Sequence, residues 1–291
     1  MATFLEKIAC ITSVTPVNKA LRCQKAEHTF ADTPCGIMDQ YISAMGCEKN
    51  LLLIDCRSRE YKLVPFASSD NAPVMVVTNS NVKHQLSGSE YPDRVRQCKE
   101  AVAIIKKSHK SVMALRDCTM EMLDSVKAQL PAVCYNRARH CIKEDARTLA
   151  TVKALEAGDY VSVGKYMTQS HRSLQEDFEV SCTELDTLVD LALAVDGVYG
   201  SRMTGGGFGG CTVTLVKRGS VEVLIKALET GFPLCECYSA VPSAGAGVAD
   251  PAIILRKKHS WLSVEYLAPL GVVVVAVAIA VAMGILRSRS S

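Results

Sequence analysis

Apolar residues recur at two different spacings along the chain, and the spacing changes at turn-forming residues. Helical spacing predicts a short amphipathic helix within residues 1–11 and a longer helix over residues 18–30. Apolar runs typical of strands follow at residues 51–54, 61–66 and 74–78, separated by polar or proline-containing turns. The first and third runs are almost wholly apolar, which predicts strands covered on both faces.

Beyond the third run the pattern is mostly helical. Residues 79–93 are predicted to form a polar loop that contains Tyr91, and residues 92–107 a helix with one apolar face. Tyr91 is either a surface side chain of this loop or a phenol that reaches a polar ligand. Long helices are also predicted over residues 132–157, closed by a glycine, and over residues 160–174.

The last third of the pattern alternates again. Ser181 and Glu184 have the spacing of a capping box, which opens a helix with apolar residues at core positions. A strand is predicted at residues 212–217, a helix at 221–228 and a strand at 234–241. Because strands and helices alternate without a strict strand–helix–strand rhythm, the pattern predicts an α+β fold.

Composition narrows the class of protein. The 291 residues can bury one large or two ordinary cores, and 48% apolar with 22% charged residues is typical of a globular chain. A net charge of +3 without a basic stripe excludes a nucleic-acid partner. The thirteen cysteines are odd in number and mostly isolated, which favours reduced thiols in the cytosol over a disulfide framework or a zinc site.

A charge-free run near the C-terminus changes this picture. Residues 267–286 are long enough to cross a bilayer as one helix, with Trp261 and Tyr266 before the run and Arg287 and Arg289 after it. The run therefore predicts a single transmembrane helix. A buried core helix is one alternative, although the run has no polar face. A tail foreign to the rest of the chain is another.

Asp39 is the first candidate for chemistry. It lies among apolar and small residues, three residues after Gly36, and helix-compatible residues follow it. We expect a loop that turns into a helix and presents the carboxylate near the first turn, where free N–H groups and the helix dipole favour an acid. Gly36 lets the backbone come close to a bound molecule. The alternative is that Asp39 only caps the helix and Gly36 only makes the turn.

A second candidate is the glycine-rich string that runs to Cys211. Five glycines occupy six positions from Gly205 to Gly210, between two predicted strands. No Lys-Ser/Thr follows, so the string is not a Walker loop, and it does not open a helix as a Rossmann loop does. It is either a tight hairpin without a ligand or a backbone surface packed near phosphates.

Several strings together resemble the galactokinase family, part of a superfamily shared with homoserine, mevalonate and phosphomevalonate kinases. They read Cys-Gly-Ile-Met-Asp-Gln-Tyr-Ile-Ser from Cys35, Leu-Ile-Asp-Cys-Arg-Ser from Leu53, Thr-Asn-Ser-Asn-Val-Lys-His from Thr78, Ser-Glu-Tyr-Pro from Ser89, and Gly-Ser-Arg-Met-Thr-Gly-Gly-Gly-Phe-Gly-Gly-Cys from Gly200. These strings occur in family order, and the resemblance as a whole covers residues 1–241.

The resemblance implies a two-domain kinase fold and ATP-dependent phosphorylation of galactose at its C1 hydroxyl. Asp39 matches the proposed general base, which also contacts the sugar, and Gly36 and Tyr91 match residues of the sugar pocket. Glu27 matches a residue expected to help hold Mg²⁺. Gly205, Gly206 and Gly207 match the family's third motif, which packs close to the nucleotide phosphates.

Two family features have no counterpart in this sequence. They are the Gly-Arg-x-Asn-Leu-Ile-Gly-Glu-His-Thr-Asp-Tyr signature and the Gly- and Ser-rich phosphate loop. We therefore expect a chain that lacks the first part of the N-terminal domain and has little kinase activity by itself. The alternative is a non-catalytic, membrane-anchored protein that uses the sugar-kinase fold for binding or as a scaffold.

The expected organisation follows from the resemblance and the apolar run. Residues 1–91 are the remainder of the N-terminal kinase domain, 92–249 the C-terminal kinase domain, 250–266 a linker, 267–286 the transmembrane helix and 287–291 a basic tail. The kinase portion is expected in the cytosol, anchored by the tail to an intracellular membrane.

Overall fold

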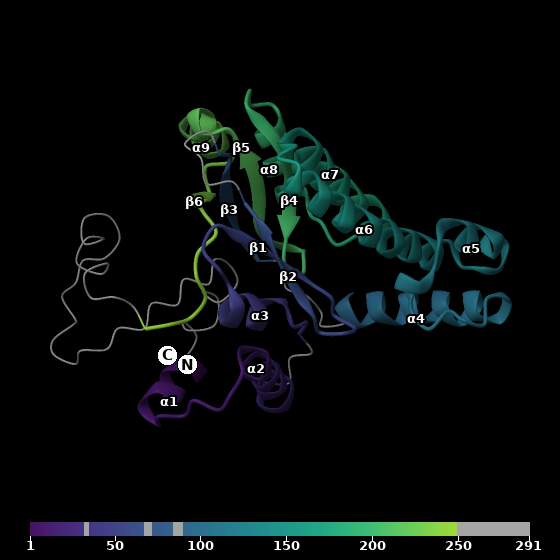
Figure 1. The fold of residues 1–291 in the computed structure, drawn as a ribbon. Coiled ribbons are helices and arrows are strands. Elements are labelled where there is room, and N and C mark those ends of the chain that lie inside the picture. The colour runs from purple at the N-terminus through teal and green to yellow at the C-terminus, as the bar shows by residue number, and fades with distance from the viewer. Residues whose placement is uncertain (32–34, 67–71, 84–89, 249–291) are drawn as a thin grey trace, which may run out of the picture. The chain divides into compact units, whose positions relative to one another are not determined.

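The computed structural model describes residues 1–31, 35–66, 72–83 and 90–248 (Figure 1). The chain forms two compact units, Met1–Phe66 with Pro242–Ser291, and Ala67–Val241. Both contain helices and antiparallel strands, which confirms the predicted α+β class. This division by compactness differs from the predicted domain boundary after residue 91, which stays a prediction.

The predicted linker, transmembrane helix and basic tail fall within residues 249–291 and lie outside the described residues. Among the helices that the structure describes, none combines the length and the apolar character needed to cross a membrane.

In its described residues, the first unit contains three helices and a two-stranded sheet, and two of the helices share a core with the sheet. Its described elements are α1 (Ala2–Ile8), α2 (Pro16–Phe30), α3 (Met38–Met45), β1 (Asn50–Ile54) and β2 (Tyr61–Pro65). Ala20 of α2 and Tyr41 of α3 are almost completely buried, and Leu52 and Ile54 of β1 pack against them. The strands pair antiparallel, with Leu52 opposite Leu63. The core thus fixes α3, which carries Asp39, against α2.

The prediction that residues 51–54 are covered on both faces is wrong. Every residue of β1 is only half-buried. The reason is that α2 and α3 pack on Leu52 and Ile54, whereas alternate residues of a strand point to the opposite face.

Gly245 and Ala246, far along the sequence, bind the backbone at the end of α3. The N–H of Gly245 donates to the carbonyl of Gly46 over 2.8 Å, and the N–H of Ala246 donates to the carbonyl of Ser43 over 2.6 Å. A Cβ on Gly245 would lie 2.8 Å from the Ser43 carbonyl oxygen. Glycine therefore permits the close approach that lets this segment satisfy the free carbonyls at the end of α3.

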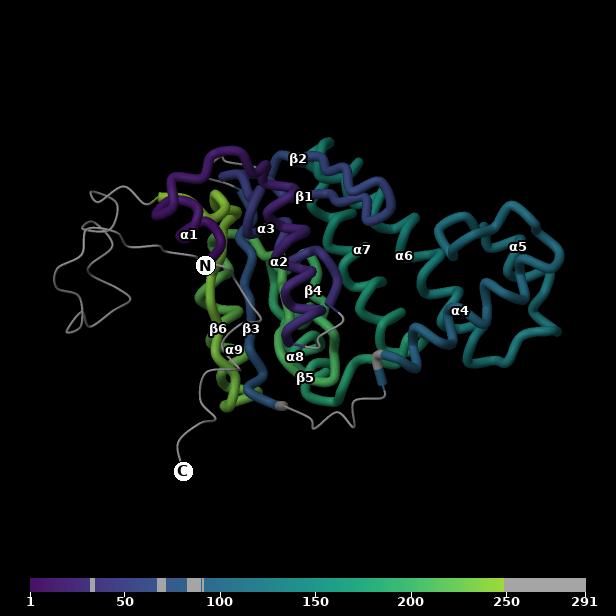
Figure 2. The backbone as a smooth tube through the Cα atoms, turned by 90° about the horizontal axis from the view of Figure 1, so that it is seen from below, coloured from purple at the N-terminus to yellow at the C-terminus, as the bar shows by residue number. Residues whose placement is uncertain are grey.

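The second unit is built on a four-stranded antiparallel sheet in the order β4-β5-β3-β6 (Figure 2). Its strands are β3 (Val74–Lys83), β4 (Val198–Thr204), β5 (Gly209–Val216) and β6 (Glu236–Ala240). Helices α8 (Thr183–Leu193) and α9 (Val221–Gly231) pack on it. Val76 and Val216 of the sheet and Leu188, Leu224 and Leu228 of the helices are completely buried there.

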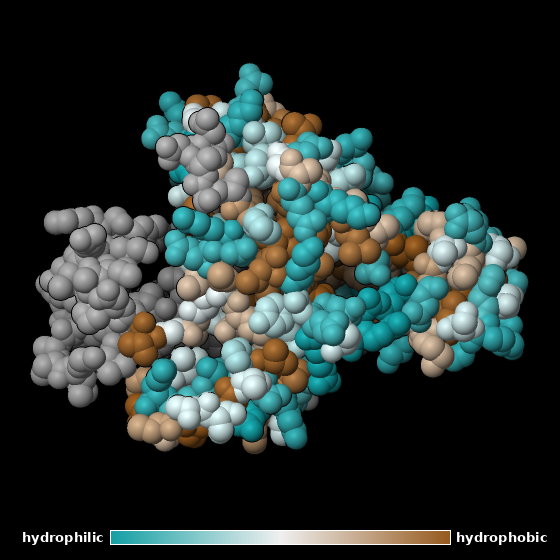
Figure 3. Space-filling view, viewed as in Figure 1, coloured by the Kyte–Doolittle hydropathy of each residue, from teal (hydrophilic) through white to brown (hydrophobic). Residues whose placement is uncertain are grey.

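A helical bundle forms the rest of this unit. It contains α4 (Glu90–Ser108), α5 (Met120–Ser125) and α6 (Ala132–Glu156), with short turns of helix at η1 (Leu115–Asp117) and η2 (Lys127–Gln129). Figures 1 and 2 show α4, α5 and the start of α6 extending away from the sheet. The apolar face predicted for α4 is confirmed, because Cys98, Val102 and Ile105 all belong to the bundle core. The outer surface over α4 and α5 mixes hydrophilic and weakly hydrophobic side chains (Figure 3).

Two local predictions are wrong. The first helix after β3 begins at Glu90, not Pro92, and β3 runs on to Lys83, so the backbone of Tyr91 is helical rather than part of a loop. Residues 84–89 of that predicted loop lie outside the described residues. The Ser181–Glu184 capping box is absent from α8, whose N-cap is Cys182 without a side-chain bond. The hydroxyl of Ser181 donates instead to the Asp186 carboxylate over 2.5 Å, and a charged acceptor outcompetes a backbone group.

Helix α7 (Tyr160–Ser173) lies unusually close to β4. A Cβ on Gly164 would lie 2.0 Å from the carbonyl oxygen of Tyr199, and one on Gly200 would lie 2.0 Å from the carbonyl oxygen of Gly164. Two glycines thus face each other across the contact between helix and strand. This contact holds the strand that leads into the glycine-rich string.

We therefore predict that Gly164→Ala destabilises the protein, although alanine is a better helix former than glycine. Relieving the overlap requires a backbone shift, so the free energy of unfolding should fall by about 1–3 kcal/mol. Urea unfolding followed by circular dichroism measures this. Gly219→Ala is the control, since a Cβ there meets no atom within 4 Å. Equal midpoints for the two variants would contradict the prediction.

Candidate active site

Asp39 occupies the first turn of α3, as predicted. The N-cap of this helix is Ile37, so the alternative that Asp39 caps it is wrong. An acid in the first turn is nevertheless favoured by the positive end of the helix dipole. The helix therefore positions the Asp39 carboxylate, and the carboxylate does not serve as the helix cap.

The chain before α3 is held against the last turns of α2 through Cys35. Its carbonyl oxygen lies 2.8 Å from Nε2 of His28 and accepts a hydrogen bond of 3.2 Å from Nε2 of Gln24. Its thiol donates to Oε2 of Glu27 over 3.1 Å, and Nε2 of Gln40 donates to Oε1 of Glu27 over 2.9 Å. Both oxygens of the Glu27 carboxylate are thereby oriented.

This arrangement brings Glu27 and Asp39 together. The surrounding protein partly shields the exposed Asp39 carboxylate from water and raises its pKa, and the negative charge of Glu27 raises this pKa further. Two carboxylates whose charges repel each other are costly to the fold and are characteristic of functional sites. In the sequence a turn whose shape could not be predicted lies between these residues, so their charge interaction was not predicted.

Glu27 suits a magnesium ion only in part. Its carboxylate is the hard oxygen ligand that Mg²⁺ prefers, and each of its oxygens has lone pairs beyond the hydrogen bond it accepts. In the described part of the chain, no group of three or more His, Cys, Asp or Glu side chains is placed to hold a metal ion. Mg²⁺ at Glu27 would therefore take most of its ligands from phosphates and water, as this ion commonly does.

Gly36 is exposed and has no left-handed backbone conformation. A Cβ built on it would meet no atom of the described residues within 4 Å. Neither the turn nor the packing of these residues therefore demands glycine. The space beside Gly36 is open to a ligand, and its role at the sugar stays a prediction.

Tyr91 is the second residue of α4, and its side chain lies outside what the structure describes. Gly36, Asp39 and Glu27 belong to the first compact unit, whereas Tyr91 and the glycine-rich string belong to the second. The roles of all these residues stay predictions.

The glycine-rich string forms the turn between β4 and β5. Gly205, Gly207, Gly209 and Gly210 have φ values of 80°, 87°, 123° and 86°, in the region that disfavours side chains. The string is therefore a hairpin, a geometry that fits both a turn without a ligand and a surface near phosphates. Gly205 and Gly206 are exposed, and a Cβ on Gly206 would meet no atom within 4 Å. The outer part of this turn is free to approach a ligand.

Gly207 has a different reason to be glycine. A Cβ on it would lie 2.0 Å from the carbonyl oxygen of Val180. The neighbouring N–H of Phe208 donates to that same oxygen over 2.8 Å. The turn is thus seated on the chain just before α8, and Gly207 serves this packing within the protein.

Two arginines hold the segment that ends at Val180. It follows α7 as a π-helix, η3 (Leu174–Phe178), and Glu179 then adopts a left-handed conformation with a φ of 52°. Arg94 donates through Nε to the carbonyl of Phe178 and through Nη2 to that of Glu179, both over 2.7 Å. Arg137 donates to the carbonyl of Asp177 over 2.5 Å and to Oε2 of Glu179 over 2.6 Å.

Sequence reasoning missed these supporting residues. Arg137 is only 1% exposed, yet it stands in a helix where charged residues normally face solvent. Its partners lie about forty positions away, so no spacing rule connects them. The left-handed Glu179 carries no local signal either, because it is imposed by these distant donors.

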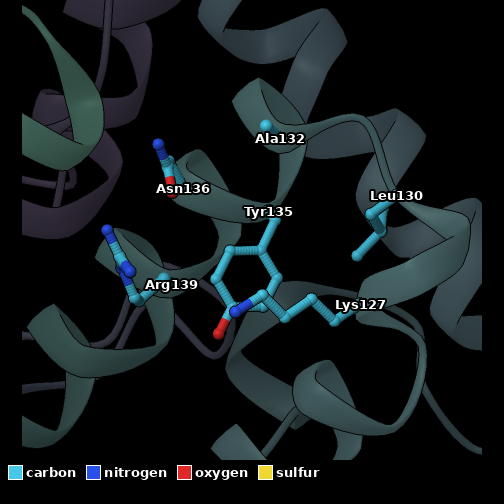
Figure 4. A pocket seen from close by; sticks show the side chains of 6 residues that line it. All are labelled: Lys127, Leu130, Ala132, Tyr135, Asn136 and Arg139. Carbon is cyan, nitrogen blue, oxygen red and sulfur yellow. The ribbon is translucent and has the colours of Figure 1, made fainter.

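A separate pocket of about 220 Å³ lies beside the start of α6 (Figure 4). Lys127 lies over the ring of Tyr135, 4.9 Å from its centroid, and the Tyr135 hydroxyl donates to the Asp124 carboxylate over 2.5 Å. Arg139 pairs with Asp177. Lys127, Tyr135 and Arg139 of the pocket lining thus already have partners within the protein, and no lining residue is a predicted site residue.

Comparison with known proteins relates these features to a family. The family model described as GHMP kinases C terminal matches residues 151–234. Human galactokinase is 52% identical over 230 residues, which are 79% of this chain and 57% of that protein. The galactokinase of Chloroflexus aurantiacus is 46% identical over 233 residues, which are 79% of this chain and 59% of that protein. The chain is homologous to galactokinases.

Solved structures agree on the fold of this galactokinase homologue. The Lactococcus lactis galactokinase complexed with galactose has a TM-score of 0.77 at 30% identity, over 84% of this chain and 63% of that one. The L. major mevalonate kinase in complex with R-mevalonate has a TM-score of 0.50 at 18% identity, over 80% and 60% of the two chains, and shares the fold alone. The chain spans 57% to 63% of the lengths of the galactokinases it matches here.

The charge repulsion at Asp39 predicts an unusual response to substitution. Because the folded chain raises the pKa of Asp39, ionisation of this group at neutral pH costs stability. We expect Asp39→Asn to increase the free energy of unfolding at pH 7, by less than about 1 kcal/mol because the side chain is exposed. The gain should disappear below the ordinary aspartate pKa of about 3.9, where both folded and unfolded chains are protonated.

Denaturant unfolding of both proteins between pH 3 and 8 measures this difference. Asp93→Asn is the matched control, because Asp93 also lies in the first turn of a helix but pairs with Arg96 at 3.1 Å. It should not stabilise the chain. A loss of stability in Asp39→Asn at pH 7 would show that the carboxylate is favourable where it stands.

Proposed function

We propose that this protein is a sugar kinase that transfers a phosphoryl group from ATP to the C1 hydroxyl of galactose. Its identity to human galactokinase and its similarity to a galactokinase complexed with galactose support the reaction and the substrate. The observation that carries the proposal is the pair of carboxylates, Glu27 and Asp39, where α2 meets α3.

Asp39 acts as the general base in this proposal. Its carboxylate accepts a hydrogen bond from the C1 hydroxyl and then its proton, as the oxygen attacks the γ-phosphorus in line with the leaving group. A raised pKa makes Asp39 a stronger base than an ordinary aspartate. While no metal ion is bound at Glu27, its negative charge contributes to this rise in the pKa of Asp39.

Gly36 and Tyr91 complete the sugar contacts that we propose. The open space beside Gly36 supports a close approach of the sugar to the backbone, because a side chain there would fill the same space. For Tyr91, the support is the family string from Ser89 to Pro92, whose phenol is expected to reach a sugar hydroxyl.

The ATP and metal assignments rest on two other features. Glu27 would hold Mg²⁺ through a carboxylate oxygen, and this ion, when bound, neutralises charge on the phosphates. Gly205, Gly206 and Gly207 are assigned to the phosphate region. The exposure of the first two supports this, since a turn without side chains lets its backbone approach an anion closely. Gly207 serves that role indirectly, by seating the turn on Val180.

Turnover by the 291-residue chain alone is expected to be low. Stabilising the charge of the transferring phosphoryl group is the larger catalytic contribution, and a general base does not replace it. The sequence contains no Gly- and Ser-rich phosphate loop to supply that stabilisation.

An assay of ADP release with galactose, Mg²⁺ and ATP tests the proposed reaction on the full chain. We expect slow release that requires galactose and falls by about 100-fold or more in Asp39→Asn, the cost of losing a general base. Gly36→Ala should weaken galactose binding by calorimetry without changing the unfolding midpoint. Glucose is the matched sugar control.

The outcomes separate the two functions considered. Galactose binding without any ADP release would favour a non-catalytic sugar-binding protein. No galactose binding would overturn the substrate assignment, and full activity in Asp39→Asn would overturn the base. Turnover in the range of ordinary kinases, about 1–100 per second, would contradict the expected impairment.

We also propose that the chain is anchored in a membrane through residues 267–286, with the kinase portion in the cytosol. The support is the sequence alone, a charge-free run with aromatic residues before it and arginines after it. The full chain should sediment with membranes and resist extraction by alkaline carbonate. A variant lacking residues 267–291 should be released. Recovery of both proteins in the supernatant would contradict the anchor.

A further inference from the structure

Two cysteines face each other in the helical bundle, far along the sequence from the predicted site residues of α2 and α3. Cys98 of α4 and Cys141 of α6 have their sulfur atoms 3.8 Å apart, and both side chains are half-buried. The S–S bond of a disulfide is about 2.05 Å long. The two sulfurs must therefore approach each other by about 1.8 Å, which is within the reach of side-chain rotation.

The surroundings favour a thiolate at Cys98. The hydrogen bond with Cys141 lowers the pKa of Cys98 most, and the positive charges of Arg137 and Arg94 lower it further against the opposing effect of burial. Burial and the same hydrogen bond raise the pKa of Cys141, which thereby keeps its proton. One cysteine is thus prepared as the nucleophile and the other as its hydrogen-bond donor.

Both arginines are fixed near the sulfurs by the fold. Arg94 lies one helical turn before Cys98 on α4, and Arg137 lies one turn before Cys141 on α6. Their guanidinium groups are held by the hydrogen bonds to residues 177–179 described above, and Nε of Arg137 also donates to Oε1 of Gln97 over 3.0 Å. Both guanidinium groups are therefore held near the two cysteines.

Other cysteines of this region lack these features. Burial and a hydrogen bond to Glu100 raise the pKa of Cys134, which lies two turns before Cys141 on the same helix. Burial and the charge of Asp117 raise the pKa of Cys118. These thiols share the bundle core with Cys98, so the difference comes from the arginines and the facing thiol.

We propose that Cys98 and Cys141 are a redox modification site, which hydrogen peroxide oxidises to a disulfide between α4 and α6. The Cys98 thiolate attacks one oxygen of the peroxide, forming an S–O bond as the O–O bond breaks, and the leaving hydroxide takes a proton to become water. The Cys141 sulfur then attacks the Cys98 sulfur. The S–S bond forms, the S–O bond breaks, and the second oxygen leaves as water with the Cys141 proton.

The electrons balance in this sequence. The two sulfurs lose two electrons in total, and the peroxide gains them as it becomes two molecules of water. A dithiol reverses the change by exchange through a mixed disulfide and is itself oxidised.

The bond has a structural consequence for the second unit. It ties together the two helices whose arginines hold residues 177–179, and the next residue, Val180, seats the glycine-rich turn. Oxidation thus restrains the support of that turn. A cross-link also limits the unfolded chain, so the oxidised protein should unfold at a higher temperature than the reduced protein.

Mass spectrometry of the full chain tests the proposal. The reduced protein is treated briefly with hydrogen peroxide, its remaining thiols are alkylated, and it is digested without reduction. We expect the loss of two alkylatable thiols, a peptide pair joined through Cys98 and Cys141, and its disappearance with dithiothreitol. Cys134→Ser and Cys118→Ser are the matched controls and should keep the cross-link.

Three variants examine the order of the steps and the effect of the arginine charge. Cys141→Ser should leave a sulfenic acid on Cys98 that a 1,3-dione traps, whereas Cys98→Ser should leave Cys141 untrapped. Arg94→Gln should slow the loss of the Cys98 thiol, because the thiolate loses a fixed positive charge. Circular dichroism confirms that each variant is folded before oxidation.

Three results would overturn the proposal. The first is that Cys98 and Cys141 remain alkylatable after other thiols of the folded chain have been oxidised. The second is a cross-link that joins either of them to a different cysteine in preference. The third is trapping of Cys141 rather than Cys98, which would reverse the assigned roles.

Discussion

The buried guanidinium of Arg137 is the constraint on which the second unit depends most. A charge removed from water is very costly unless it is paired and its donors are all used. Gln97, the carbonyl of Asp177 and the carboxylate of Glu179 meet this demand together. They do so only if the chain after α7 opens into a π-helix and Glu179 becomes left-handed. One buried side chain thereby dictates an irregular stretch of backbone.

The consequence reaches the glycine-rich turn. The irregular stretch delivers the carbonyl of Val180 to the N–H of Phe208, and Gly207 is the residue that allows this approach. A Cβ on the exposed Gly206 just before it would meet no atom within 4 Å, so packing does not require glycine there. The glycines of this string are therefore glycine for different physical reasons. Gly207 allows packing within the protein, whereas the exposed Gly206 leaves space beside the turn.

In the first unit, hydrogen bonds also fix the path of the chain next to a helix. Here, however, they bring two negative charges near each other instead of pairing opposite charges. The carbonyl of Cys35 is held by α2, and this fixes the approach of the chain to α3. The same contact places Asp39 in the field of Glu27, which is unfavourable for stability. The hydrogen bonds of Gln40 and Cys35 to Glu27 offset part of that cost.

The sequence by itself determined much of this protein. Hydrophobic spacing located α2, α6, α9 and the strands β3, β5 and β6, because burial of one face imposes its period on the residues. The strings around Asp39 and Gly205 identified the family. Local rules failed at Ser181, whose hydroxyl binds the charged Asp186 instead of capping α8. They also failed at the predicted loop, into which β3 and α4 extend.

Only the tertiary structure decided which residues meet. The repulsion between Glu27 and Asp39, the pair formed by Cys98 and Cys141, and the contact of Gly207 with Val180 all join segments that no periodicity links. The physical reason is that spacing reports which face of an element is buried, whereas these contacts depend on how buried faces, charges and backbone donors of several elements are satisfied at once.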